Sequence, residues 1–232
     1  MAAALARGWG DPILATDSGS GRAQQLVDEV GGEVVSNQEC AERADVLILA
    51  HKPYQLEQVA EEIDPKGIVV TILGSITVAQ VEAVFPHAKV LRVEPNTPSA
   101  LRRGVLVFAA SEHPEAKAVQ DLFSRLGTVV ELPERLVDIA GAVSGVGPAY
   151  WALIAEAWTD AAIRHGIPAA QAATLVTETM AGTAALLTQT DTLSARRAVT
   201  SPGGSTARGL HALEKGGVRA ALADAMDAVV NG

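Results

Sequence analysis

The 232-residue sequence has one cysteine, few aromatic residues and no excess of positive charge. The lone Cys40 excludes an intramolecular disulfide and is typical of a reducing compartment. The formal net charge of −9 argues against a nucleic-acid partner, because phosphate binding needs clustered lysine and arginine. No uninterrupted apolar run reaches the ~18 residues that cross a bilayer, and the first ten residues lack the apolar core of a secretory signal. We therefore expect a soluble cytoplasmic protein without a membrane partner.

Histidine is also scarce, and its five copies lie far apart in the chain. No two of them have the helical spacing of a metal-ligand pair, so the sequence predicts no metal site. The order of serine, histidine and aspartate along the chain does not by itself indicate a hydrolytic triad.

The first half of the chain alternates short β-branched runs with helical segments. The predicted strands span residues 13–16, 45–50, 68–73, 89–93, 105–108 and 128–131. The runs at 45–50 and 68–73 are apolar almost throughout, which is typical of strands buried on both faces. This alternation predicts parallel βαβ units in a doubly wound sheet over residues 1–132.

After Pro133 the pattern changes to long alanine-rich segments with helical periodicity. Helices are predicted at 148–165 and 169–187, with a helical pair over 210–230 that Gly216-Gly217 interrupts. Residues 133–232 therefore read as an all-α domain, so the fold class is α/β followed by all-α. The first long helix is apolar nearly all round, and such a helix must be buried nearly all round. A bundle shared between subunits would bury it, and a compact monomeric bundle is the alternative.

Three short motifs suggest a family. Pro95-Asn96-Thr97-Pro98 follows the fourth predicted strand, residues 144–150 (Ser-Gly-Val-Gly-Pro-Ala-Tyr) begin the long helix, and residues 199–206 (Val-Thr-Ser-Pro-Gly-Gly-Ser-Thr) precede the last helices. Each motif is weak by itself. In this order on an α/β-then-α chain, they resemble the pyrroline-5-carboxylate reductases over nearly the whole length.

The resemblance implies a fold, an activity and a cofactor. The fold would be a Rossmann-like domain followed by a helical dimerisation domain that forms a homodimer or a larger homo-oligomer. The activity would be reduction of 1-pyrroline-5-carboxylate to L-proline in proline biosynthesis. NADPH would serve as cofactor, with NADH as the alternative.

The segment Ser201–Thr206 has the composition of an anion-binding turn. Pro202 fixes one φ angle, and Gly203 and Gly204 permit conformations closed to other residues. Ser205 or Thr206 could cap the following helix, leaving N–H groups that suit a carboxylate. An ordinary capped turn is the alternative. The resemblance implies that the substrate is held by Ser201, Gly204, Ser205 and Thr206, with Val199 lining its ring.

The resemblance also bears on the proton donor. Some family members place a threonine hydroxyl on the long helix, near the position where this sequence has Leu153. Its absence leaves water or the Thr206 hydroxyl, and we take Thr206 as the candidate catalytic residue. A protonated imine is already electrophilic, so the protein needs mainly to align donor and acceptor.

A family member is expected to begin with a strand and a G-x-G-x-x-G loop that precedes the first helix. Here residues 1–8 already resemble that helix, and Gly19-Ser20-Gly21 follows the second family strand. Because the absent strand is central in the family, we expect a gap in the sheet and weaker NADPH binding. A start codon assigned too late would explain this, with a strand and glycine loop encoded upstream. A natural truncation is the alternative.

The segment after the first predicted strand would read the adenosine ribose. An acidic residue there favours NAD, whereas serine and arginine can hold the 2′-phosphate of NADP, so Asp17 and Arg22 point to different cofactors. The resemblance favours NADP and implies phosphate contacts from Ser18, Ser20 and Arg22, with Asn37 on the adenosine side. A solvated turn in which Ser20 caps the next helix is the alternative.

Two further segments follow strands at the edge where ligands bind in open α/β sheets. The resemblance places His51, Lys52 and Pro53 beside the nicotinamide ribose and pyrophosphate, and Asn96 and Thr97 in the nicotinamide pocket. The family more often has valine where His51 stands and an apolar residue where Glu94 stands. Glu94 would either alter substrate choice or face solvent.

Two other functions fit the same layout. A β-hydroxyacid dehydrogenase needs a catalytic lysine on its long interdomain helix, and residues 149–162 contain none. A non-catalytic oligomer that has lost its nucleotide site is the second, and titration with NADPH would distinguish it from an enzyme.

Overall fold

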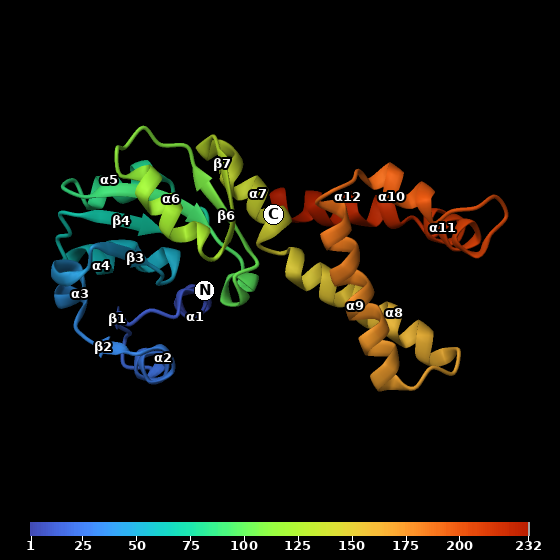
Figure 1. Ribbon diagram of the computed structural model, residues 1–232. Helices are drawn as coiled ribbons and strands as arrows, with labels where there is room; N and C mark the ends of the chain where they lie inside the picture. The colour runs from blue at the N-terminus through green and yellow to red at the C-terminus, as the bar shows by residue number, and fades with distance from the viewer. Residues whose placement is uncertain (232) are drawn as a thin grey trace. The chain divides into compact units, whose positions relative to one another are not determined.

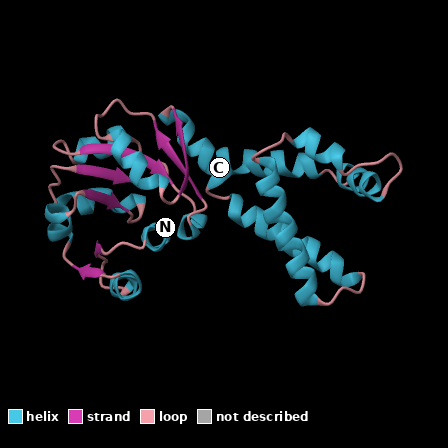
Figure 2. Ribbon diagram, in the orientation of Figure 1, coloured by secondary structure: helices cyan, strands magenta, loops and turns pink. Residues whose placement is uncertain are grey.

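The computed structural model describes residues 1–231, in two compact units that divide after Pro148. The first unit has helices on both sides of β-sheet structure, and the second is helical throughout the part described (Figures 1 and 2). Residues 133–148 pack within the first unit. The functional division predicted between residues 132 and 133 stays a prediction.

The strands of the first unit form two sheets. A two-stranded parallel sheet contains β1 (Ile13–Ala15) and β2 (Gly32–Val34). A five-stranded sheet contains, in order, β3 (Val46–Leu49), β4 (Ile68–Thr71), β5 (Lys89–Glu94), β6 (Gly104–Ala109) and β7 (Gly127–Leu132). Among the described residues no strand joins β1 to β3, which is the gap that the family resemblance predicted.

One strand pair departs from the expected parallel arrangement. β5 and β6 are antiparallel, whereas the other pairs are parallel. Only the 3₁₀ helix η2 (Thr97–Leu101) and a few loop residues join β5 to β6. A parallel crossover needs a dozen or more residues, so this short connection forces the chain to turn back.

Helices cover the sheets on two faces. They are α1 (Ala2–Trp9), α2 (Arg22–Val30), α3 (Asn37–Arg43), α4 (Leu56–Glu62) after the 3₁₀ helix η1 (Pro53–Gln55), α5 (Val78–Val84), α6 (Ala116–Ser124) and, after η3 (Glu134–Leu136), α7 (Val137–Ser144). Val69 and Val70, neighbours on β4, belong to different buried clusters. Because successive strand residues point to opposite faces, the sheet has a core on each side, as a doubly wound fold requires.

The helix α1 lies close against η2. A Cβ added to Gly8 would come within 2.1 Å of the carbonyl oxygen of Ser99, so only glycine permits this approach. Trp9, at the end of α1, donates a 3.0 Å hydrogen bond from Nε1 to the carbonyl of Leu122 and meets Phe123 edge to face at 5.1 Å. These contacts anchor the start of the chain in the core.

The second unit contains α8 (Gly147–Arg164), whose first two residues lie in the first unit, α9 (Ala169–Leu187), α10 (Thr192–Ala198), α11 (Ser205–Lys215) and α12 (Val218–Val230). The sequence predicted α8 and α9 almost to the residue but missed α10. That short helix is defined by Asp191, whose carboxylate accepts hydrogen bonds from the N–H groups of Leu193 and Ser194 at 2.9 and 3.0 Å.

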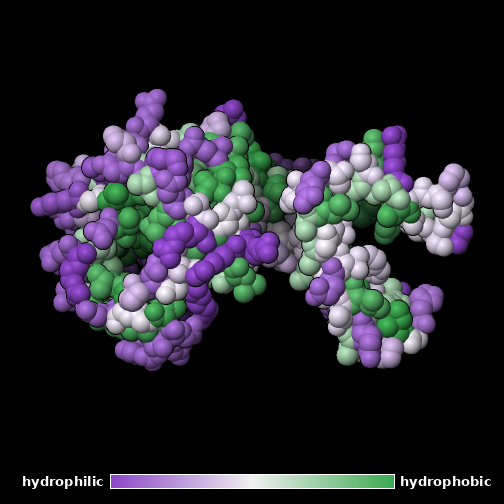
Figure 3. Space-filling view, in the orientation of Figure 1, coloured by the Kyte–Doolittle hydropathy of each residue, from purple (hydrophilic) through white to green (hydrophobic). Residues whose placement is uncertain are grey.

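The second unit leaves much of its apolar surface uncovered. Of its described residues, Ala172 and Val176 are the buried apolar ones, whereas Trp151, Leu153 and Trp158 on α8 are 61%, 64% and 52% exposed. Figure 3 shows green, apolar surface over these helices. The helix α8 is therefore not buried within a single chain, in agreement with the expectation of a bundle shared between subunits.

Residues 134–164, which comprise η3, α7 and α8, are together long and apolar enough to cross a bilayer, by length and composition alone. No uninterrupted apolar run marks this segment in the sequence, because polar residues are scattered along it while its mean hydropathy stays high. A core helix of a soluble protein meets the same criterion, so this single stretch is weak evidence for a membrane.

Candidate cofactor and substrate sites

The parallel strands β3, β4 and β5 are neighbours, so their carboxyl ends lie at one edge of the sheet. The segment His51–Pro53 follows β3, residues 72–77 follow β4, and Asn96-Thr97 follows β5. Ligands of open α/β sheets bind at this edge. The fold thus brings together two groups of predicted cofactor residues, with the loop after β4 between them.

His51 has a polar atom that lacks a partner. Its Nδ1 lies 2.9 Å from the carbonyl oxygen of Lys52, and a carbonyl can only accept a hydrogen bond, so Nδ1 carries the proton. In the neutral ring Nε2 is then an acceptor, and this atom is buried without a hydrogen-bond partner among the described residues. An unsatisfied acceptor at this edge is a group that a bound cofactor could satisfy.

Asn96 uses its side-chain amide within the protein. Its Nδ2 donates to the carbonyl of Ser144 at 3.0 Å, and its Oδ1 accepts from the N–H of Val105 at 2.9 Å. The residue is only 6% exposed. Asn96 therefore fixes the loop after β5 to β6 and to the end of α7, while Thr97 beside it is exposed.

Glu94, at the end of β5, does not simply face solvent. The side chain is partly buried, and its Cγ would lie 3.3 Å from a Cβ at Gly141 of α7. Burial raises the pKa of the Glu94 carboxyl, although the positive charge of Arg92 opposes that shift and Asp138 adds to it.

The carboxylate of Asp17 organises the segment between β1 and α2. One oxygen accepts from the N–H groups of Gly19 and Ser20, and the other from the N–H of Ala23 and the hydroxyl of Ser20. These hydrogen bonds, chiefly that from Ala23, lower the pKa of Asp17 to about 2. The N-cap of α2 is Gly21, so the alternative in which Ser20 caps the helix is wrong. Ser20 donates its hydroxyl to Asp17 instead.

Two predicted cofactor residues beside Asp17 point away from the protein. Ser18 and Arg22 are both exposed, and Arg22 forms no ion pair with a carboxylate in the part of the chain that the structure describes. Asn37, at the start of α3, accepts a 2.6 Å hydrogen bond from the hydroxyl of Thr16 and donates to Glu62 at 2.5 Å. It connects the end of β1 to α4, and the sequence did not single out Thr16.

The predicted substrate loop lies in the second unit, between α10 and α11. Gly203 has φ of +70°, and the N–H of Gly204 donates to the carbonyl of Ser201 at 3.0 Å. A Cβ at Gly204 would lie 2.4 Å from Ser201 Oγ and 3.2 Å from the Ser201 carbonyl oxygen, so a side chain there would require Ser201 to shift. Gly204 itself occupies the N-cap position without a side-chain cap. The expectation that Ser205 or Thr206 caps this helix is wrong, because both belong to its first turn.

An uncapped first turn leaves N–H groups free for an anion, and the structure adds a cation that the sequence analysis missed. Arg208 donates from Nη1 to the carbonyl of Gly203 at 2.8 Å and from Nη2 to Ser205 Oγ at 3.2 Å. Its position three residues after Ser205 on the same helix face was the available signal. Arg208 therefore braces the loop and places positive charge beside it.

Comparison with known proteins identifies the family. Residues 134–232 match the family model described as pyrroline-5-carboxylate reductase dimerisation, and residues 1–78 match that described as NADP oxidoreductase, coenzyme F420-dependent. Over 201 residues the chain is 39% identical to a pyrroline-5-carboxylate reductase of Synechocystis sp.. The matched region covers 83% of this chain and 75% of that relative. The chain belongs to the pyrroline-5-carboxylate reductase family.

Solved structures of pyrroline-5-carboxylate reductases have the same fold. The enzyme of Streptococcus pyogenes matches with a TM-score of 0.88 at 26% identity, over 100% of this chain and 93% of that one. The pyrroline carboxylate reductase of Plasmodium falciparum, solved with NADP bound, matches with a TM-score of 0.85 at 27% identity, over 97% and 90%. The predicted fold class, a Rossmann-like domain with a gap in its sheet followed by a helical dimerisation domain, is confirmed.

Proposed function

We propose that this protein reduces 1-pyrroline-5-carboxylate to L-proline with NADPH, as an enzyme of proline biosynthesis. The observation that carries the proposal is the 39% identity to a reductase of this name over four fifths of the chain. The match of residues 1–78 to an NADP oxidoreductase family, and the NADP bound to the Plasmodium falciparum relative, support the cofactor.

Several residues of the first unit support such a cofactor. When bound, NADPH supplies the hydride that reduces the imine carbon. The 2′-phosphate would be held by Ser18, Ser20 and Arg22. The carboxylate of Asp17 supports this assignment. Both of its oxygens already accept hydrogen bonds from its own loop, so they are not available to ribose hydroxyls. The unpaired positive charge of Arg22 supports NADPH over NADH.

At the carboxyl edge, Lys52 and Pro53 would contact the nicotinamide ribose and pyrophosphate, and Thr97 would line the nicotinamide pocket. The Nε2 atom of His51, which is buried without a hydrogen-bond partner among the described residues, supports a polar contact to the cofactor at the end of β3. Asn37 would contact the adenosine side, with its amide oriented by Thr16 and Glu62.

In the second unit, the loop Ser201–Thr206 would hold the substrate carboxylate. Its uncapped helix N-terminus and the neighbouring guanidinium of Arg208 both favour an anion. Ser201, Gly204, Ser205 and Thr206 would make the contacts, with Val199 against the ring. The Thr206 hydroxyl, or a water that it orients, would give the imine nitrogen its proton as the hydride arrives at carbon.

The protein is also proposed to act as a homodimer, or a larger homo-oligomer, in the cytoplasm. The match of residues 134–232 to a dimerisation family supports self-association. The exposed apolar side chains of α8 support its place in the interface. Burial in that interface would also explain why residues 134–164 are so apolar, with no need for a membrane. Nucleic acid is not an expected partner, because the net charge is −9.

The direct assay mixes the purified protein with NADPH and 1-pyrroline-5-carboxylate and follows the loss of NADPH absorbance together with the formation of proline. We expect NADPH loss that depends on the imine and matches proline formed. NADPH binding without turnover would instead favour the non-catalytic oligomer. Turnover of a β-hydroxy acid would favour the rival dehydrogenase, which the missing lysine in residues 149–162 argues against.

A further inference from the structure

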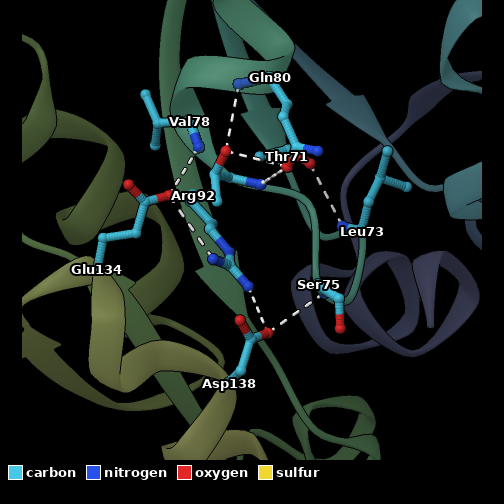
Figure 4. Close-up of polar contacts among 9 residues, drawn as sticks. Thr71, Leu73, Ser75, Val78, Gln80, Arg92, Glu134 and Asp138 are labelled. Carbon is cyan, nitrogen blue, oxygen red and sulfur yellow. Dashed lines mark hydrogen bonds and ion pairs between the residues drawn. The ribbon is translucent and has the colours of Figure 1, made fainter.

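A buried arginine connects three elements of the first unit. Arg92 on β5 has a side chain only 2% exposed. Its Nη2 donates to Asp138 of α7 at 2.5 Å, and its Nη1 lies 3.6 Å from Glu134 of η3 (Figure 4). A buried guanidinium needs such partners, because an unpaired charge in the interior is costly.

The same two carboxylates hold the loop after β4. Asp138 Oδ1 accepts from the N–H of Ser75 at 3.2 Å, and Glu134 Oε1 accepts from the N–H of Val78 at 2.6 Å. Figure 4 shows Asp138 linked to both Arg92 and Ser75, and Glu134 linked to both Arg92 and Val78. One guanidinium thus orients two acceptors. Asp138 fixes an N–H of the β4–α5 loop, and Glu134 fixes the N–H of Val78, the first residue of α5.

The loop has a conformation that needs such support. Ser75 has φ of +62°, in the left-handed region that residues other than glycine rarely adopt. Backbone of this kind persists where surrounding contacts hold it, and it is frequent at functional sites. The hydrogen bond from the Ser75 N–H to Asp138 is such a contact.

The order of the strands places this loop in the middle of the candidate cofactor edge. β4 lies between β3, which leads to His51–Pro53, and β5, which leads to Asn96 and Thr97. A cofactor that reaches from the first group to the second must pass the loop between them. The shape of residues 72–77 therefore affects how the nicotinamide half is seated.

We propose that Asp138, oriented by Arg92 and assisted by Glu134, is a positioning residue that fixes the β4–α5 loop for NADPH. The inference rests on the proposed function. It assigns to residues 134–138, which lie within the dimerisation match, a role in the nucleotide-binding unit. Asp138 acts through the Ser75 backbone and does not touch the reacting atoms.

Two substitutions separate positioning from stability. In Asp138→Asn the side chain keeps an oxygen for the Ser75 N–H, whereas Asp138→Ala removes it. Both variants deprive Arg92 of a charged partner, so both should lower the melting temperature, and Asp138→Ala should lower it more because it also removes the oxygen to which Arg92 donates. Only Asp138→Ala should weaken NADPH binding, by about tenfold in Kd, while Asp138→Asn should stay within about twofold of the natural protein.

The measurements are NADPH fluorescence titration, thermal unfolding and hydrogen–deuterium exchange of a peptide that covers residues 72–78. Amide exchange of this peptide can be measured without cofactor. Its rate should rise in Asp138→Ala but not in Asp138→Asn. The pair Asp121→Ala and Asp121→Asn on α6 is the matched control, because Asp121 contacts Lys117 on its own helix. These two control variants should leave NADPH binding and loop exchange unchanged.

Equal NADPH affinity in the natural protein and in Asp138→Ala would overturn the positioning role and leave the proposed function intact. Equal weakening in the alanine and asparagine variants would also overturn it, because charge and stability would then explain the loss. A natural protein that binds no NADPH would overturn the proposed function and the inference together, and the titration of that protein alone distinguishes this case.

Discussion

At the residue scale, Asp17 and Arg22 lie in the same short segment, carry opposite charges and have different roles. From sequence alone they point to different cofactors. In the structure Asp17 directs both carboxylate oxygens into its own loop, whereas Arg22 is exposed and pairs with no described carboxylate. The balance therefore favours a phosphate ligand near Arg22.

Replacing Arg22 by alanine tests this assignment. We expect kcat/KM for NADPH to fall about ten- to a hundredfold, as for the loss of a hydrogen bond to a charged group, while the value for NADH stays nearly unchanged. Arg219→Ala, which removes a guanidinium already paired with Glu214 on the second unit, is the control. An equal loss with both cofactors would remove Arg22 from the phosphate site.

The Thr206 hydroxyl is the second residue-scale prediction. Thr206→Val preserves shape and removes only the polar atom, so kcat/KM for 1-pyrroline-5-carboxylate should fall about ten- to a hundredfold with NADPH affinity unchanged. Thr188→Val is the matched control, because the Thr188 hydroxyl, at the C-cap of α9, donates to the carbonyl of Ala185 in that helix. A well-folded Thr206→Val enzyme with normal kinetics would exclude Thr206 from the site.

At the scale of elements, the first turn of α2 depends on the charge of Asp17. The pKa of Asp17 is about 2 in the folded protein, below the ordinary 3.8, because N–H groups and Ser20 stabilise its charged form. A lowered carboxyl pKa contributes stability that is present above the unfolded value and disappears as the pH falls through the folded value.

The segment 17–23 should therefore keep its structure down to about pH 4 and loosen between about pH 4 and pH 2. Amide exchange of Gly19, Ser20 and Ala23 measures this directly, since their N–H groups donate to Asp17. In Asp17→Asn the same amides should exchange faster at neutral pH and show little change over this window. If these amides in the natural protein stayed equally protected from exchange between about pH 4 and pH 2, the role of the carboxylate would be contradicted.

Elements with strong periodicity were predictable from sequence, and those that depend on distant contacts were not. The buried strands near residues 46–49 and 68–71 and the helices α8 and α9 have clear apolar patterns. β2 begins with glycine and is exposed along its three residues, so no pattern marked it. The amide of Asn96, bonded to Val105 and Ser144, and the support of Ser75 by Asp138 arise from partners nine to 63 residues away. No local motif encodes such contacts.

At the scale of the whole molecule, each of the two units has one unusual feature. Its α/β unit has two sheets that are not joined by a strand among the described residues. Its helical unit exposes large apolar side chains, including Trp151, Leu153 and Trp158. Exposed apolar surface of this kind marks an interface, and the match to a dimerisation family is consistent with a second copy of the chain.

A charge placed on α8 should break that assembly. Leu153 is 64% exposed in the single chain, and Leu153→Asp would bury an unpaired carboxylate in an interface of more than ~2,000 Å². We expect sedimentation to show a dimer or larger oligomer for the natural protein and monomer or unfolded chain for the variant. Leu101→Asp, at a residue 78% exposed on η2, should stay assembled. A stable natural monomer at micromolar concentration would refute the shared bundle.

The central claim is that the protein transfers a hydride from NADPH to the imine carbon of 1-pyrroline-5-carboxylate. The most direct test supplies NADPH that carries deuterium at the transferable position of nicotinamide C4 and examines the proline by mass spectrometry and NMR. The account predicts L-proline with a single deuterium at C5, formed in step with cofactor oxidation. Proline without the label, or cofactor oxidation without proline, would contradict it.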